Sequence, residues 1–120
     1  MHLINGRTRK PIAQSVEVAD SRKTRRRGLL GRDSLPEDAG LMLIPCAAVH
    51  TAFMRFTIDI IFLDRNACVV RMVPGLTPWR MAVCWRAHSV IELPAGRIAA
   101  TSVRIGDNLY LAPLSERRAS

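Results

Sequence analysis

Apolar and polar residues alternate in several short runs of the chain, a period-two pattern that is typical of half-buried β-strands. The first run spans residues 12–19, where Val16 and Val18 share one face and Glu17 lies on the other. A second run, at 41–44, is wholly apolar and is closed by a proline, which indicates a short buried strand. The pattern therefore predicts one strand at each place.

Between these two strands the sequence predicts one short helix. Asp20 or Ser21 is a suitable N-cap, and the helix runs to about Leu30 before Gly31 stops it. Most of its residues are basic, and like charges four positions apart destabilise a helix. Only Leu29 and Leu30 can anchor it to a core, so we expect it to be the least stable regular element.

The middle of the chain, residues 50–64, carries the strongest pattern. Residues 50–58 alternate and predict a strand, and the apolar residues 60–63 predict a fully buried strand that continues it. Residues 64–67 have the composition of a turn, and alternation returns at 68–73. Together these features predict a β-hairpin.

The last third of the chain predicts two more strands and a helical turn. A proline–glycine pair at 74–75 ends the hairpin and opens a loop. Residues 88–93 then form a strand that ends in a Pro-Ala-Gly turn, and a helical turn follows near 98–101. The final strand lies at 108–111, and the residues from 113 to 120 are expected to form a flexible tail.

Short strands with few helices predict a single domain over residues 1–112, of α+β class and mainly β. We expect a compact antiparallel β barrel or sandwich with one or two short helices, and the sequence does not decide between barrel and sandwich. The chain has 120 residues, of which 48% are hydrophobic and only 5% aromatic. This composition can bury a sizeable core, built mainly from aliphatic side chains, and it excludes a disordered chain.

Four blocks of sequence resemble an uncharacterised bacterial family, domain of unknown function 192. They are Gly28–Arg32, His50–Asp64, Val90–Gly96 and Gly106–Asp107, and the resemblance covers about residues 16 to 111. It implies a mainly β fold. It implies no activity, because the family has none established.

The formal net charge is +8, carried almost wholly by arginine, with lysine only at Lys10 and Lys23. Arginine binds phosphate in a bidentate manner, which indicates an anionic partner, but codon usage in a GC-rich genome gives the same excess. No window is apolar enough to cross a membrane and no signal-peptide run begins the chain. We therefore expect a leaderless cytoplasmic protein with no membrane partner.

Polar residues within the strongest pattern are the candidate binding site. Asp59 stands between two isoleucines, so its carboxylate must be paired, solvated or protonated. We expect Asp59 to line a small polar patch with His50, Thr51, Arg55 and Glu92. For Asp59 and Glu92 themselves we favour a structural role, in which both accept hydrogen bonds from backbone amides at strand ends.

The polar patch supports two functions. The first is a small binding or accessory module whose partner is a small molecule or a protein, and this is the function that we predict. The alternative is a hydrolase-like enzyme that uses His50 with Asp59 or Glu92 for proton transfer, with or without a metal. No nucleophile elbow, phosphate loop or dinucleotide fingerprint is present, so we predict no cofactor.

The cysteines raise a separate metal hypothesis. Cys46 and His50 have the same spacing as Cys84 and His88, and two thiolates with two imidazoles suit tetrahedral zinc. That spacing is not among the commonest for zinc ligands, so we predict no metal and interpret the cysteines as small core residues. Cys46 close to His50 also raises a thiol nucleophile, for which sequence proximity is no evidence.

The basic segment Arg22–Arg27 is the last candidate. With Arg7, Arg9 and Lys10 it could form a positive face that binds anions or nucleic acid without specificity. No aromatic residue is interleaved with it and no nucleic-acid motif is present, so we do not expect a nucleic-acid partner. The alternative is a solvated basic face.

Overall fold

The computed structural model describes residues 1–113, so the predicted tail lies outside the described residues except for Pro113. Ten strands and two short helices follow one another in this part of the chain. They are β1 (His2–Asn5), β2 (Pro11–Ala13), β3 (Ser15–Ala19), α1 (Arg22–Arg27), β4 (Ala39–Leu43), β5 (Ala48–His50), β6 (Ile58–Leu63), β7 (Val69–Leu76), β8 (Met81–Val83), β9 (Ser89–Pro94), α2 (Arg97–Thr101) and β10 (Leu109–Ala112).

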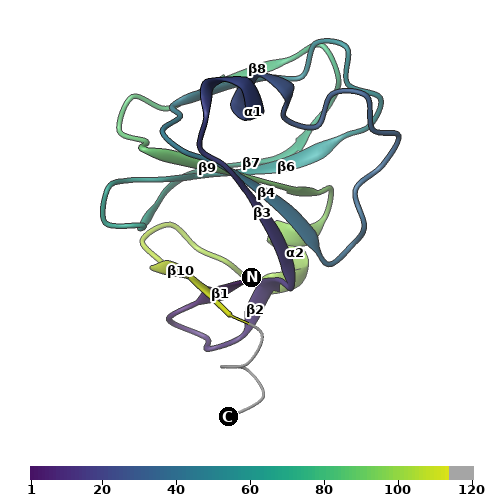
Figure 1. The fold of residues 1–120 in the computed structure, drawn as a ribbon. Coiled ribbons are helices and arrows are strands. Elements are labelled where there is room, and N and C mark those ends of the chain that lie inside the picture. Colours follow the sequence, from purple (N-terminus) through teal and green to yellow (C-terminus); the bar gives the residue numbers. More distant parts are fainter. Residues whose placement is uncertain (114–120) are drawn as a thin grey trace.

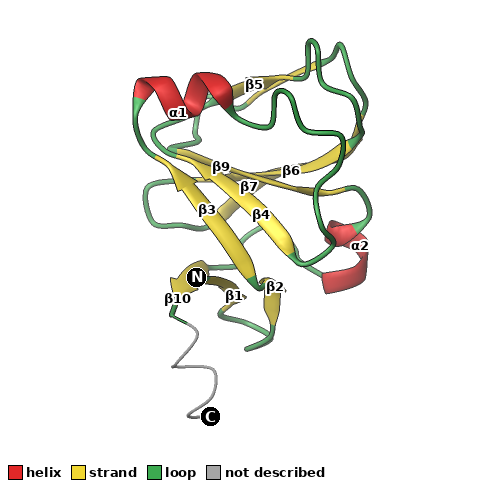
Figure 2. Ribbon diagram, turned by 45° about the vertical axis from the view of Figure 1, so that its right-hand side comes forward, coloured by secondary structure: helices red, strands yellow, loops and turns green. Residues whose placement is uncertain are grey.

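A five-stranded sheet with the order β3-β4-β9-β6-β7 forms the middle of the molecule (Figure 1). Its neighbouring strands are antiparallel except for the pair β3–β4, which is parallel and is connected through α1. The small sheet β10-β1-β2 lies on one side together with α2, and the ribbon β5–β8 lies on the other side together with α1 (Figure 2). The prediction of a mainly antiparallel β fold with two short helices is confirmed.

Strand β6 shows why the sheet is covered on both faces. Every residue of β6 is buried, since the strand lies between β9 and β7 with a layer above and below it. Successive side chains of a strand point to opposite faces. Accordingly Ile60 and Phe62 pack in the core under α1 and β5, while Ile61 and Leu63 pack in the core over β1 and β2.

Other predicted elements have different outcomes. The hairpin, the strand before the Pro-Ala-Gly turn, the helical turn and the last strand are confirmed as β6–β7, β9, α2 and β10. The helix is confirmed with Ser21 as its N-cap, but it ends at Gly28 rather than at Gly31. Val18 is 41% exposed, so it does not share the burial of Val16. The predicted strand at 12–19 is divided into β2 and β3, which belong to different sheets, and strands β1, β5 and β8 were not predicted.

The predicted strand at 50–58 is wrong. Strand β5 ends at His50, and residues 51–57 form turns and bends before β6 begins. The chain leaves the extended conformation at Phe53, whose φ is 64°. The alternation of apolar residues in this segment therefore belongs to a loop that is pinned to the core through Met54.

The proline–glycine pair at 74–75 does not end the hairpin either. It lies within β7, at a register shift in the pairing with β6, where Gly75 has a φ of 67°. A bulge accommodates both residues without ending the strand. No helix in residues 1–113 is long and apolar enough to span a membrane.

Candidate functional site

Strand β9 places a carboxyl group in the interior of the molecule. Ile91 and Leu93 point into the core on the β1 side, so Glu92 points to the opposite side, as Val90 does. Glu92 is only 4% exposed. Glu92 stands between Ile91 and Leu93 in β9. The strand therefore carries an acidic side chain at a buried position, where an apolar one is expected.

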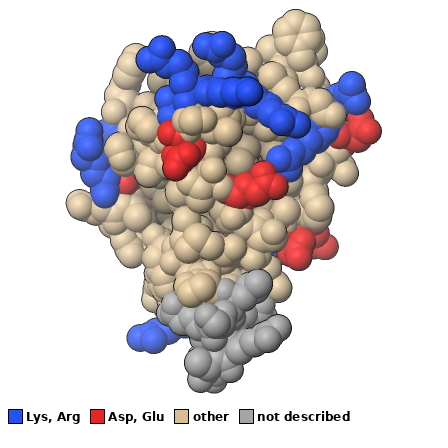
Figure 3. Space-filling view, in the orientation of Figure 1, with Lys and Arg blue, Asp and Glu red and all other residues tan. Residues whose placement is uncertain are grey.

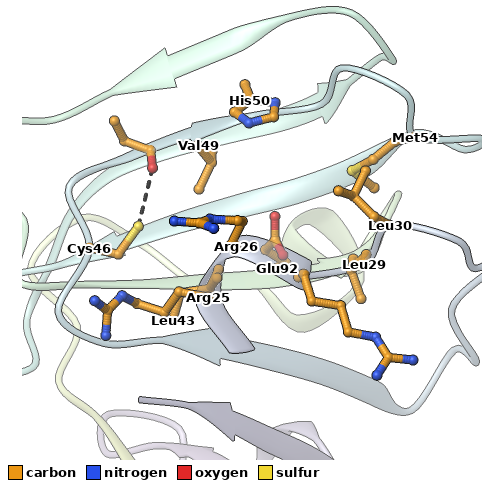
Figure 4. A pocket seen from close by; sticks show the side chains of 13 residues that line it. Arg25, Arg26, Leu29, Leu30, Leu43, Cys46, Val49, His50, Met54 and Glu92 are labelled. Carbon is orange, nitrogen blue, oxygen red and sulfur yellow. Dashed lines mark hydrogen bonds between the residues drawn. The ribbon is translucent and has the colours of Figure 1, made fainter. Parts of the chain in front are cut away.

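Glu92 lies at a cavity of about 270 Å³ between α1 and β5. Figure 4 shows its carboxyl pointing into the space under Val49 and His50. The wall is about equally polar and apolar, and the polar groups come from α1, β5, β9 and the loop before β5. The lining residues are Arg25, Arg26, Arg27, Gly28, Leu29, Leu30, Leu43, Cys46, Ala48, Val49, His50, Met54 and Glu92.

Burial raises the pKa of Glu92 to about 7, and the charge of Arg32 lowers it only in part. Arg32 is itself engaged by Glu17, at 3.0 Å. No hydrogen bond to the Glu92 carboxyl contributes, and none links it to another residue of the described chain. The Glu92 oxygens keep some contact with the open space, since they are not among the fully buried side-chain atoms without a hydrogen-bond partner. Glu92 thus combines a pKa near neutral with a carboxyl that faces an open space.

Gly28 ends α1 beside this carboxyl. Its φ is 46°, and a methyl group added there would lie 3.8 Å from Glu92 Oε1. Leu29, directly after it, is buried in the same core. The Gly-Leu-Leu-Gly-Arg block thus turns the chain down from the helix onto the sheet and closes one side of the cavity.

Two further titratable side chains reach the cavity from the β5 side. His50 is exposed at the end of β5, and Cys46 lies in the loop before it. The Cys46 thiol donates a hydrogen bond to the carbonyl of Ala48 at 3.1 Å, drawn as the dashed line in Figure 4. Burial raises the pKa of the Cys46 thiol, which keeps it protonated and is the opposite of what an activated nucleophile needs.

Arginines of α1 cover the outer side of the cavity. Arg25 is held in place, because its Nη1 donates to the carbonyls of Asp20 at 3.1 Å and Ile44 at 3.4 Å. Arg26 is exposed and extends across the opening between Val49 and Glu92 in Figure 4. Figure 3 shows the Lys and Arg side chains gathered over α1 on this face.

Of the five predicted site residues, the structure brings His50 and Glu92 together at one cavity and places Thr51, Arg55 and Asp59 elsewhere. Arg55 is exposed and pairs with Asp33 at 2.6 Å. Whether these residues bind a ligand stays a prediction. Of the pairs considered for an enzyme, His50 with Glu92 shares the cavity, and His50 with Asp59 does not.

Asp59 has the structural role expected for it. Its carboxylate is buried and accepts hydrogen bonds from three backbone amides, of Gly75 at 2.9 Å, Gly96 at 3.1 Å and Ile98 at 2.9 Å. These amides belong to the bulge in β7, the turn after β9 and the first turn of α2. Asp59 therefore links three elements and points away from the cavity.

Thr51 links two loops. Its hydroxyl donates to the carbonyl of Thr77 at 2.6 Å and accepts from the amide of Arg80 at 2.9 Å. Its carbonyl also accepts from the amides of Met54 at 3.1 Å and Trp79 at 3.0 Å. Thr51 is fully buried. It fixes the loop 51–57 against the loop before β8.

Replacing Thr51 by valine keeps its shape and removes the hydroxyl, so the Arg80 amide loses its partner. We expect the free energy of unfolding to fall by about 1–3 kcal/mol. Urea denaturation of the variant beside Thr77→Val, which changes an exposed threonine of the loop before β8, measures this difference. Equal urea midpoints for the two variants would show that the Thr51 hydroxyl does not contribute to stability.

In residues 1–113, no three His, Cys, Asp or Glu side chains stand close enough together to hold a metal ion. Cys46 and His50 both line the cavity, whereas Cys84 and His88 do not. The two Cys-x3-His spacings therefore do not assemble the four-ligand site that the zinc hypothesis requires.

Sequence reasoning missed the contribution of α1 and the Cys46 loop to this site. Leu29 and Leu30 were expected to anchor the helix, but nothing in the sequence showed that they would face Glu92. The available signal was the acidic residue inside the apolar run 89–93. A cavity opposite that residue depends on which element the tertiary fold lays over β9.

Three of the four sequence blocks contribute residues to this cavity. They are Gly28–Arg32, His50–Asp64 and Val90–Gly96. Residues 3–111 match the family model DUF192, described as "Uncharacterized ACR, COG1430". A UPF0127 protein of Pyrococcus furiosus is 38% identical over 113 residues, which cover 89% of this chain and 95% of the relative. A UPF0127 protein of Pyrococcus abyssi is 37% identical over 100 residues, covering 78% of this chain and 83% of the relative.

Two solved structures have the same fold. One, from Sinorhizobium meliloti and described as a "putative transcription regulator", has a TM-score of 0.78 at 20% identity and covers 91% of this chain and 89% of its own. The other, a protein of unknown function from Novosphingobium aromaticivorans, has a TM-score of 0.74 at 20% identity and covers 80% of this chain and 74% of its own.

The relatives correct one expectation. The family was expected to be bacterial, but the Pyrococcus proteins are archaeal, so it is not confined to bacteria. The match to the family model extends over nearly all of the described residues. The chain belongs to the DUF192 family of uncharacterised proteins.

Proposed function

We propose that this chain is a small-molecule-binding protein whose ligand enters the cavity between α1 and β5. The observation that carries the proposal is the carboxyl group of Glu92, which is 4% exposed, has no partner in the described chain and faces open space. Burying a charge without a partner costs free energy. A ligand that donates a hydrogen bond or brings a positive charge to Glu92 removes that cost.

The lining indicates what else the ligand carries. Leu29, Leu43 and Met54 offer an apolar wall, which suits a short hydrocarbon body. Arg26 at the opening suits an anionic group at the other end. The cavity of about 270 Å³ is small, so the ligand is of metabolite size. These features together favour a small amphoteric molecule with its cationic end against Glu92.

Four probes of similar length test this chemistry. They are 4-aminobutyrate, n-butylammonium, n-butanol and butyrate, each titrated into labelled protein and followed by amide chemical shifts in NMR spectra. We expect 4-aminobutyrate to bind best and butyrate and butanol least, with the shifts centred on α1, β5 and β9. Equal binding of all four, or shifts spread over the surface, would contradict the proposal.

The affinity for the cationic probes should depend on pH. A cation binds the ionised carboxylate, and the pKa of Glu92 is about 7. The fraction ionised, and hence the affinity, should therefore rise about tenfold from one unit below this pKa to one unit above it. Glu92→Gln should abolish this pH dependence. Asp38→Asn, which removes an exposed carboxylate that does not line the cavity, is the matched control and should retain it.

We also propose that the protein is a cytoplasmic binding or accessory module. Its three cysteines are free thiols, and free thiols persist in a reducing compartment. The enzyme that uses His50 with Glu92 stays an alternative prediction, since both side chains line the cavity.

A further inference from the structure

The charge of the molecule is concentrated in one layer. The segments 21–32, 45–57 and 77–88, which contain α1, β5, β8 and their loops, hold nine of the eighteen Lys and Arg and none of the ten Asp and Glu. The remaining sequence, with nine basic and ten acidic residues, is close to neutral. Figure 3 shows the basic side chains gathered at the α1 end of the molecule. Arg32 and Arg55 pair with Glu17 and Asp33 at its edge, and the other seven basic residues give this layer most of the net charge of the chain.

The same layer exposes the largest apolar side chains. Trp85 is 92% exposed, Phe53 72%, Met81 69% and Trp79 65%, and no other large hydrophobic residue of the described chain reaches these values. Met81 begins β8, and the two tryptophans lie just beyond its two ends. They are the only tryptophans of the chain. A single layer therefore combines positive charge with protruding aromatic side chains.

The backbone holds two of these rings outward under strain. Phe53 has a φ of 64° and Trp79 a φ of 65°, values that bulky residues rarely adopt. Their rings touch edge to face, with centroids 4.6 Å apart and planes at 61°. Thr51 binds both loops and fixes this arrangement. Such strain persists where the surrounding structure enforces it, commonly at a functional position.

We propose that the α1 and β8 layer is a docking surface for an anionic lipid membrane, with the aromatic residues at the lipid interface. Clustered Lys and Arg attract anionic headgroups, and Trp and Phe partition into the interfacial region. The sequence-based expectation of no membrane partner rested on the lack of a spanning segment, which surface docking does not need. Docking uses the outer side of this layer, whereas the Glu92 cavity lies on its inner side, and Arg26 and Arg27 also line the cavity.

Charge and ring geometry distinguish this partner from two others. A second copy of the chain would bring its own basic layer against this one, and like charges would repel. Single-stranded nucleic acid stacks its bases on free aromatic faces. Here Phe53 and Trp79 pack against each other, so Trp85 is the one ring of the three without an aromatic partner among the described residues, and Met81, an aliphatic side chain, is also exposed. This arrangement suits lipid chains better than bases.

Intrinsic fluorescence tests the proposal directly, because both tryptophans report on this surface. The full chain is mixed with vesicles of phosphatidylglycerol, vesicles of phosphatidylcholine, or oligothymidylate. We expect phosphatidylglycerol vesicles to bind the protein and shift its emission to shorter wavelength, and added salt to reverse this. Phosphatidylcholine should do neither. Oligothymidylate that binds more tightly than the anionic vesicles and quenches the emission would overturn the proposal in favour of nucleic acid.

Two double variants with the same loss of charge test whether vesicle binding depends on where the charge lies or only on its total. Arg26→Gln with Arg27→Gln should weaken vesicle binding by about tenfold or more, whereas Arg65→Gln with Arg104→Gln, equal in charge but outside the layer, should weaken it less than about threefold. Trp85→Ser should also weaken binding while leaving the denaturation midpoint unchanged, because that side chain is almost fully exposed. Equal losses for the two double variants, or undiminished binding of the Trp85 variant, would refute docking through this layer.

Discussion

Replacing Asp59 by alanine should lower the free energy of unfolding by about 3–5 kcal/mol, more than any other single change considered for this chain. The substitution leaves three backbone amides without the acceptor that they now share, those of Gly75, Gly96 and Ile98. All three lie around a residue that is 1% exposed, so water does not readily replace the carboxylate. Urea or thermal denaturation measures the loss.

The control for Asp59 is Asp38→Ala. Asp38 is exposed, and its side chain makes no hydrogen bond in the described residues, so its loss should change stability by less than about 0.5 kcal/mol. A midpoint for Asp59→Ala that matches this control would mean that the three amides find other partners, and the structural role of Asp59 would be withdrawn.

Glu92→Gln should make the protein more stable at pH 8 by about 3 kcal/mol and should leave its stability near pH 4 almost unchanged. Folding raises the pKa of Glu92 from 4.5 to about 7. Between these values the folded state binds more protons than the unfolded state, so the stability of the unmodified protein falls as the pH rises. Each pKa unit by which the folded and unfolded states differ corresponds to about 1.4 kcal/mol of stability.

Denaturation curves from pH 4 to pH 8 measure this effect. The unmodified protein should lose stability through this range relative to Glu92→Gln. Asp38→Asn, which changes an exposed carboxylate away from the cavity, should follow the unmodified protein. Parallel curves for Glu92→Gln and the unmodified protein would show that the carboxyl is solvated in the folded state. A residue that destabilises the fold at neutral pH is a common mark of a binding site.

The alternation of side chains predicted much of the sheet because burial in a layered β fold follows that pattern closely. The apolar run 60–63 identified β6, and turn chemistry at 64–67 identified its hairpin with β7. The segment 50–58 failed for a physical reason. Met54 and Phe56 pack against the core at the spacing of a strand, but the segment is held by the hydrogen bonds of Thr51 and by this packing, not by strand pairing.

The candidate site was predictable only in part. The sequence identified Glu92 and Asp59 as acidic residues within apolar runs, but it could not distinguish them, because each needs partners that only the fold supplies. The fold gives Asp59 three amides and gives Glu92 none. The contact between the exposed rings of Phe53 and Trp79 could not be predicted either. The two residues are far apart in sequence, and the hydrogen bonds of Thr51 bring their loops together.

In the proposed function, the Glu92 carboxyl has no partner in the described chain and pairs with a cationic group of the ligand in the cavity. An NMR titration of its carboxyl carbon, first in the free protein and then with saturating 4-aminobutyrate, tests this most directly. We expect an inflection near pH 7 in the free protein and a lower one with the probe, because a nearby cation favours the ionised form. An inflection near the ordinary value of 4.5 in the free protein, or one that the probe does not move, would contradict the account.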